Sequence, residues 1–166
     1  MSSRRYTTSL KTLSLVAGAA LVFAGATHVQ TGAQSQPLDD GKAAFQRRED
    51  TMKRMGRPFY LGIGRVVKGT APYGPDTVAA AKTVASLAGT LDRTLFPAGS
   101  DIADSKIKPE IFSAYDRVDQ LIAAVQKSAA QLVPAVEGGN KAEIAAAYTA
   151  VANACNACHK QFRKEE

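Results

Sequence analysis

Close to its C-terminus the chain reads Cys155-Asn156-Ala157-Cys158-His159, the pattern C-x-x-C-H. Two thiols three residues apart lie on one turn of a helix, so each is placed to form a thioether with a vinyl group of a porphyrin. The adjacent imidazole is a usual axial ligand of haem iron. The stretch predicts one covalently attached haem c, with His159 as the iron ligand, and the rest of the chain has to enclose that group.

Two other sites also use a C-x-x-C pair, a thioredoxin-like redox pair and half of a zinc site. The redox pair is typical of a βαβ pattern, and a tetrahedral zinc site needs further ligands that a chain with two cysteines does not supply. A helical protein whose motif never receives haem remains a third alternative. Covalent haem is the interpretation that accounts for both cysteines and the histidine together.

Composition favours helices over strands. The chain has 166 residues, is rich in alanine and lacks tryptophan. Runs that alternate β-branched or aromatic residues with polar ones between turn signals are missing. This length and pattern predict a single all-α domain.

The N-terminus has the pattern of an export signal. Basic residues precede an apolar run over residues 13–24, and small residues come after it, so cleavage after Ala26 or after Ala33 fits. The run is shorter than the roughly 20 residues that span a bilayer. We therefore expect a signal peptide over residues 1–26, a periplasmic protein, and no stable membrane insertion after the signal is removed.

The mature chain is close to neutral in charge. Removing residues 1–26 takes three cations from the 21, which leaves 18 cations against 15 acids. The mature chain has no concentrated basic patch with interleaved aromatic residues, so no nucleic-acid partner is expected. Residues 27–37 are small and polar and predict a flexible leader. His28 lies there, which makes it a poor candidate for a second axial ligand.

Four amphipathic helices are predicted over residues 38–166. The first runs from Lys42 to Met55 behind the acidic pair Asp39-Asp40 and has one face formed by Phe45, Arg48, Met52 and Met55. The second begins at Pro75-Asp76 and stops near Leu95-Phe96-Pro97. The third begins at Pro109 and ends or kinks at Pro134. The fourth begins after the cap Asn140 and carries the C-x-x-C-H motif. With a cofactor between facing helices, this pattern predicts an antiparallel four-helix bundle around one covalently attached haem.

The chain resembles the cytochrome c′ superfamily, and most closely its low-spin, Met-ligated branch, the cytochrome c-556 type. The resemblance covers the whole mature chain, and its C-terminal motif is its strongest part. The residues that carry it are Met52-Lys53, Gly56-Arg57, Lys68-Gly69, Pro72-Tyr73, Leu95-Phe96-Pro97, Pro109-Glu110-Ile111-Phe112 and Cys155 to Arg163.

The resemblance implies that the residue at Met52 decides how the iron is coordinated. If Met52 ligates the iron opposite His159, the haem is six-coordinate and low-spin, and the protein carries single electrons in the periplasm. This is the function we expect, with Met55, one turn along the same face, as the fallback ligand. The alternative is a five-coordinate, high-spin cytochrome c′ that binds NO or CO.

Two arginines are further candidates for the haem site. Arg48 lies four residues before Met52, and Arg163 lies four residues after His159, so each is one helical turn from an axial position. We expect each to lie near a haem propionate, and for Arg163 the family resemblance supports this.

The same features indicate which partners to expect. Three lysines at positions 53, 160 and 164 form a candidate docking surface for periplasmic redox proteins. Family members often dimerise through their first two helices, so a homodimer is a further expectation. No nucleophile or acid–base pair is visible in the chain, and no enzymatic turnover is predicted.

Overall fold

The computed structural model describes residues 36–165, with side chains from Asp40 onward, and every regular element in this part is a helix. The predicted all-α class is confirmed. The predicted signal peptide, His28 and the leader up to residue 35 lie outside the described residues. The elements are α1 (Gln36–Arg57), the π-helix η1 (Pro58–Ile63), α2 (Gly64–Val67), α3 (Pro75–Gly89), the 3₁₀ turns η2 (Arg93–Leu95) and η3 (Pro109–Ser113), α4 (Tyr115–Glu137) and α5 (Lys141–Phe162).

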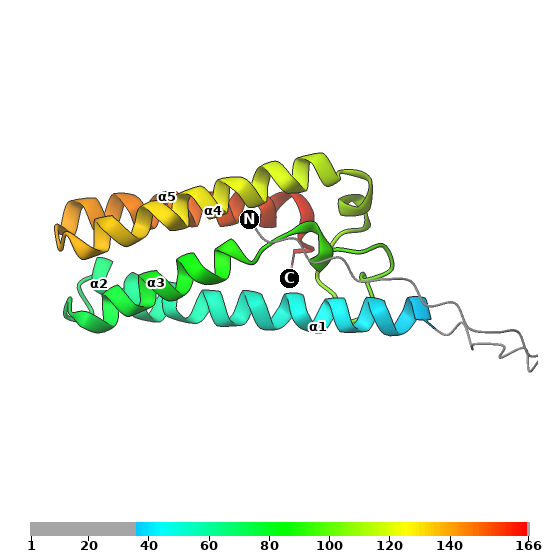
Figure 1. Ribbon diagram of the computed structural model, residues 1–166, viewed down its shortest axis with the longest axis horizontal. Coiled ribbons are helices and arrows are strands. Elements are labelled where there is room, and N and C mark those ends of the chain that lie inside the picture. Colours follow the sequence, from blue (N-terminus) through cyan, green and yellow to red (C-terminus); the bar gives the residue numbers. More distant parts are fainter. Residues whose placement is uncertain (1–35, 166) are drawn as a thin grey trace, which may run out of the picture. The chain divides into compact units, whose positions relative to one another are not determined.

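The long helices form the predicted antiparallel four-helix bundle (Figure 1). α1, continued by η1 and α2, is followed by α3, α4 and α5, and each begins at the end of the bundle where the preceding one stops. Residues 68–74 and 138–140 are short turns, whereas residues 90–114 form a longer connection that contains η2 and η3. α4 packs against both α3 and α5, and α3 packs against α1.

The first helix is longer at both ends than its sequence predicts. It begins at Gln36, inside the predicted leader. It also continues past Met55 and Pro58, where the sequence indicates a break. The helix widens into a π-helix at that point, and such segments accommodate an extra residue within a helix. Within this segment Phe59 is buried, while Tyr60 is 55% exposed.

The helix predicted from Pro109 is shorter than expected at its start. Pro109 opens the 3₁₀ turn η3, and α4 begins only at Tyr115. Pro134, expected to end or kink this helix, lies inside its last turn and α4 stops three residues later, at Glu137. Pro134 has no N–H to donate to the carbonyl of Ala130, so one hydrogen bond is missing close to the end of the helix.

The last helix starts as its sequence predicts. Asn140 Oδ1 accepts hydrogen bonds from the backbone N–H groups of Ala142 (2.9 Å) and Glu143 (3.3 Å). These bonds satisfy donors that the first turn of a helix leaves free. The other end of α5 is also held, because the Lys108 N–H donates to Phe162 O (2.8 Å). The C-x-x-C-H stretch therefore lies on a helix that is fixed at both ends.

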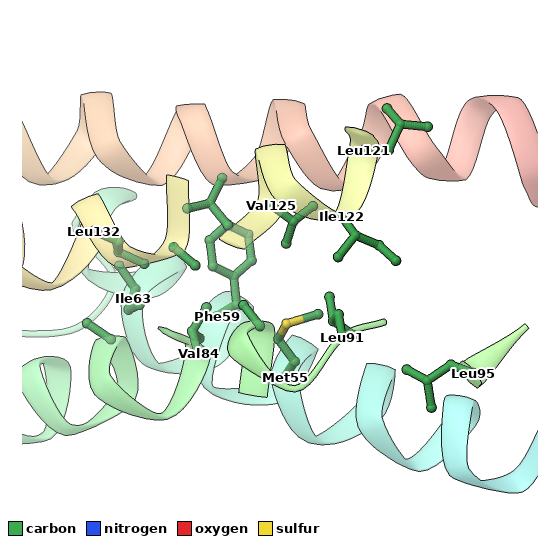
Figure 2. Packing of buried hydrophobic residues seen from close by; sticks show 14 of the residues in the cluster. Met55, Phe59, Ile63, Val84, Leu91, Leu95, Leu121, Ile122, Val125 and Leu132 are labelled. Carbon is green, nitrogen blue, oxygen red and sulfur yellow. The ribbon is translucent and has the colours of Figure 1, made fainter. Parts of the chain in front are cut away.

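The core is one hydrophobic cluster that runs along the inside of the bundle (Figure 2). Ile63, Leu132 and Ile144 are almost completely buried in it. Each such side chain contributes about 1.5–3 kcal/mol through burial. Met55 also belongs to this cluster and lies with Leu91, Ile122 and Val125 at the part of the core that borders the inner cavity of the haem site.

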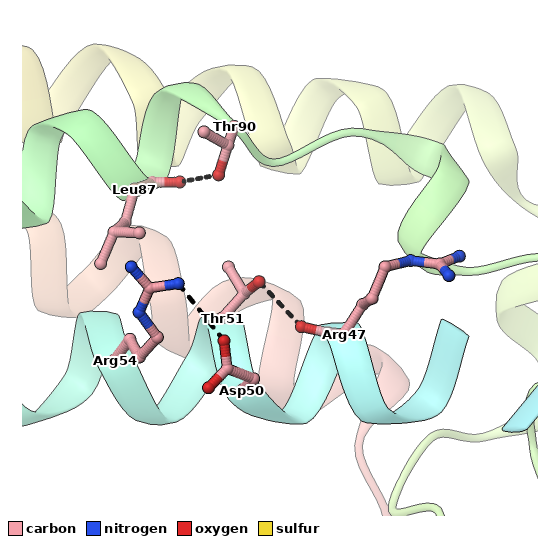
Figure 3. Close-up of polar contacts among 6 residues, drawn as sticks. All are labelled: Arg47, Asp50, Thr51, Arg54, Leu87 and Thr90. Carbon is pink, nitrogen blue, oxygen red and sulfur yellow. Dashed lines mark hydrogen bonds and ion pairs between the residues drawn. The ribbon is translucent and has the colours of Figure 1, made fainter. Parts of the chain in front are cut away.

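Polar contacts on the outer face of α1 are local (Figure 3). The Arg54 guanidinium pairs with Asp50 at 3.4 Å, and the Thr51 hydroxyl donates to Arg47 O at 2.8 Å. Both members of the ion pair are more than half exposed, so solvent screens it and it adds little stability. Within residues 36–165, no helix combines the length and the apolar character that crossing a membrane requires.

Candidate haem site

The three residues of the motif lie on the last two turns of α5 and border one cavity. Cys155, Cys158 and His159 are all half-buried, and the two thiols are free. A spacing of three residues on a helix places both sulfur atoms on one face. The structure thus presents two thiols and one imidazole together, as the sequence predicts.

Burial keeps these groups uncharged. It raises the pKa of both cysteine thiols, and at Cys158 the Cys155 thiol adds to this while Arg117 acts in the opposite direction. Burial also lowers the pKa of His159, and the positive charge of Arg163 lowers it further. A neutral imidazole has a free lone pair, which is the form that binds a metal.

Two adjoining cavities meet at this motif. An inner cavity of about 100 Å³ lies inside the bundle, and an outer cavity of about 410 Å³ opens toward the surface. The inner walls carry no charged side chain among the described residues. The residues that line both cavities are Met52, Tyr60, Phe96, Cys158 and His159.

The linings fit a haem. The apolar inner walls match the hydrocarbon body of a tetrapyrrole, and the outer cavity carries cations that match its two carboxylates. These cations are Arg48, Lys53, Lys106 and Arg163, against the acids Glu49 and Asp104. The free thiols and the neutral imidazole supply the donors that a covalently attached, His-ligated haem requires.

Both methionines predicted as candidate ligands border the site, in different ways. Met52 is half-buried and lines the inner and the outer cavity together with His159. Met55 is 7% exposed, belongs to the hydrophobic core and lines the inner cavity alone. Met52 is thus the methionine that borders every part of the site.

Arg48 has hydrogen-bond partners that its position in the sequence does not indicate. It lines the outer cavity as expected, but it is only 5% exposed, and its guanidinium donates four hydrogen bonds to the connection between α3 and α4. Four of its five N–H groups are therefore used within the protein. The sequence indicates a residue one turn from Met52, but the partners of the guanidinium lie about 50 residues away.

The fold places the other predicted cations at or near the outer cavity, except Lys160. Arg163 directly follows α5, is exposed and lines the outer cavity. Lys53 also lines it and pairs with Glu49 at 3.1 Å. Lys164 Nζ donates to Ser105 O at 3.0 Å, which fixes its amine at the same edge. Lys160 is exposed and lines neither cavity.

Several residues of the site were not predicted from the sequence. Tyr60 and Phe96 line both cavities, and Ser105 and Lys106 form part of the outer edge. Tyr60 follows the start of the π-helix, where the 3.6-residue period no longer indicates which face a residue occupies. The others lie in a connection without any period, where only Phe96 belongs to a stretch that resembles the family.

Comparisons with known proteins agree with the four-helix fold. The sequence model described as Cytochrome C′ matches residues 43–163. A cytochrome c′ of Alcaligenes xylosoxydans xylosoxydans is 32% identical over 128 residues, which cover 74% of this chain and 99% of that protein. Two solved structures of cytochrome c prime from Alcaligenes xylosoxidans have a TM-score of 0.67. One, a ferrous variant with bound NO, is 26% identical and covers 76% of this chain and 97% of its own. The other, a variant with bound carbon monoxide, is 28% identical and covers 75% and 97%.

The family model spans most of the chain, and the fold agrees with that of the solved relatives over nearly their whole length. Proteins of this family carry one covalently attached haem c per chain, and both cysteines that such an attachment needs lie at one cavity here. The chain therefore belongs to the cytochrome c′ family and is a c-type cytochrome with a single haem.

Proposed function

We propose that this cytochrome binds small uncharged diatomic molecules, NO or CO, at an iron that His159 alone ligates. Cys155 and Cys158 would hold the haem through two thioether bonds, and Met52 would border the site of the small ligand without binding the metal. The haem supplies the iron at which such a molecule binds. This is the alternative that the sequence left open, and it is now favoured over the six-coordinate electron carrier.

The observation that carries the proposal is the apolar lining of the inner cavity. Apart from the half-exposed Tyr60 and the motif residues, its walls are hydrocarbon, glycine and thioether groups. A cavity of this kind admits a small neutral molecule and excludes charged ones, because an unpaired charge in an apolar site is costly. The two solved relatives with bound NO and bound carbon monoxide support the same ligand class.

Spectra of the exported holoprotein test this proposal. We expect the ferric and ferrous forms to be high-spin and the ferrous form to bind CO readily. Met52→Leu should leave the spin state unchanged, since the proposal does not make Met52 a ligand of the iron. Met55→Leu is the matched control on the same helix. Low-spin spectra in the wild type that become high-spin only in Met52→Leu would contradict the proposal.

The second candidate is an electron carrier with His159 and Met52 as the two axial ligands. Its specific support is that Met52 and His159 line the same two cavities from different helices. In that case CO binds the wild type poorly, and Met52→Leu increases CO binding. The same set of spectra therefore decides between the two functions.

We further propose that residues 1–26 direct export and that the mature protein works in the periplasm as a homodimer. An open groove between the first and second long helices of the bundle supports a second copy as partner, because Leu61, which is 56% exposed, borders it. Mass spectrometry of the periplasmic fraction tests the cleavage after Ala26 or Ala33. Sedimentation of wild type and Leu61→Asp tests the dimer, which the aspartate should dissociate.

A further inference from the structure

Arg48 is a buried cation held by neutral groups. Its Nη1 donates to Leu95 O (2.7 Å) and to the Ser100 hydroxyl (3.1 Å). Its Nη2 donates to Ser100 O (2.9 Å) and to the Ser105 hydroxyl (3.0 Å). The guanidinium also lies 5.6 Å from the centre of the Phe96 ring, within the range of cation–π attraction.

We propose that Arg48 is a charged positioning residue of the haem site. It holds the connection from Leu95 to Ser105 against α1, and it places beside the haem a positive charge that raises the reduction potential of the iron. This inference goes beyond gas binding and holds for either axial ligation of the iron.

The charge of Arg48 has no contacting counter-ion among the described residues. All four of its hydrogen-bond acceptors are carbonyl or hydroxyl oxygens, and none of the ion pairs in this part of the chain includes it. Burial lowers its pKa, and the more distant Asp101 acts in the opposite direction. An arginine stays protonated throughout the range in which proteins function, so the site keeps a fixed positive charge.

This charge adjoins the cavity that receives the haem. Arg48 lines the outer cavity together with His159 and with Met52, which lies one turn further along α1. A positive charge stabilises the less positive of two oxidation states of a nearby metal, here the ferrous one. The effect is large for a buried charge because the protein interior screens it less than water does.

The hydrogen bonds of Arg48 also connect the two sides of the outer cavity. Ser105, which accepts from Arg48, is in turn linked to the C-terminal segment, because its carbonyl accepts from Lys164 Nζ at 3.0 Å. The Lys164 N–H donates to Lys106 O at 2.7 Å. A continuous set of contacts thus joins α1 to the segment directly after α5, and Arg48 is its member on α1.

Three variants of the holoprotein distinguish the effect of the positive charge of Arg48 from the effect of its hydrogen bonds. Arg48→Gln removes the charge and most of the hydrogen bonds. Arg48→Lys keeps the positive charge and loses the planar guanidinium group with its several N–H donors. The double variant Ser100→Ala and Ser105→Ala keeps the charge and loses two of the four acceptors. For each, the midpoint potential is measured by spectroelectrochemical titration, and the protection of backbone amides in residues 95–107 is measured by hydrogen exchange.

We expect Arg48→Gln to lower the midpoint potential and to reduce amide protection in residues 95–107 at least tenfold. The serine double variant should lose amide protection, but its midpoint potential should lie at least as close to that of wild type as to that of Arg48→Gln. Arg48→Lys should behave likewise. An unchanged potential or unchanged protection in Arg48→Gln overturns the proposal. So does a serine double variant whose potential falls as far as that of Arg48→Gln.

If Arg48→Gln yields no holoprotein, the other two variants decide. Both retain a positive charge, so a potential well below wild type in both of them overturns the proposal, as does unchanged protection in both. Neither readout involves NO or CO. A failure of the proposed gas binding is therefore distinguishable from a failure of this inference.

Discussion

The ring of Phe59 stacks on that of Tyr148, with 4.3 Å between the ring centres and 12° between the planes. Phe59 belongs to the π-helix η1 and Tyr148 to α5, so the contact joins the first helix of the bundle to the helix that carries the haem motif. Phe59 is 3% exposed and also lines the inner cavity. The π-helix therefore builds part of the site as well as part of the core.

Loss of the Phe59 ring should destabilise the protein strongly. We expect Phe59→Ala to reduce the free energy of unfolding by about 3–5 kcal/mol, because it removes a buried aromatic side chain and leaves a cavity. The adjacent Tyr60 is 55% exposed, so Tyr60→Ala should cost less than about 1 kcal/mol. Guanidinium denaturation of the two holoproteins measures the difference, and equal losses would contradict the assigned burial.

Tyr148 should make stability depend on pH in the alkaline range. Burial raises its pKa, and Tyr60 raises it further. The folded state therefore resists ionisation of this phenol more than the unfolded state does. The stability that this difference contributes is fully present below pH 10, the usual tyrosine pKa, and is lost as the pH rises toward the folded pKa. Denaturation between about pH 9 and about pH 11.5 should show a smaller decline for Tyr148→Phe than for wild type.

Substitution by alanine should have different effects on stability at two helical glycines. A Cβ at Gly41 would overlap the carbonyl oxygen of Gly99, so Gly41→Ala forces α1 and the connection after α3 apart and should cost about 1–3 kcal/mol. A Cβ at Gly89 meets nothing within 4 Å, and alanine there should be neutral or stabilising by up to about 1 kcal/mol. Thermal unfolding of both variants checks the pair. A stable Gly41→Ala protein would show that α1 is not held close to Gly99.

The two cysteines should decide whether haem remains attached after denaturation. We expect the exported wild type to retain its pigment through acid–acetone treatment, because thioether bonds survive conditions that release a ligated haem. The double variant Cys155→Ala and Cys158→Ala should lose all of it. Asn156→Ala, at an exposed position between the cysteines, is the control and should keep its haem. The mass of the denatured polypeptide measures each outcome.

Much of the helical pattern was predictable from the sequence because it depends on neighbours in the chain. The cap at Asn140 is set by residues within a few positions of one another. The first helix was predicted too short for the same reason. Glycine and proline near position 56 locally favour a break, whereas partners of the continued helix, such as Tyr148 for Phe59, lie far along the chain.

The sequence by itself determined that two thiols and an imidazole share one face of the last helix, because a spacing of one helical turn is a local property. The tertiary structure alone decided what Arg48 binds. Its acceptors lie 47 to 57 residues further along the chain, in a connection whose path no periodic pattern describes. It also decided that Met52, rather than Met55, borders both cavities, because these cavities form only where residues of α1, α5 and the connection after α3 come together in the folded bundle.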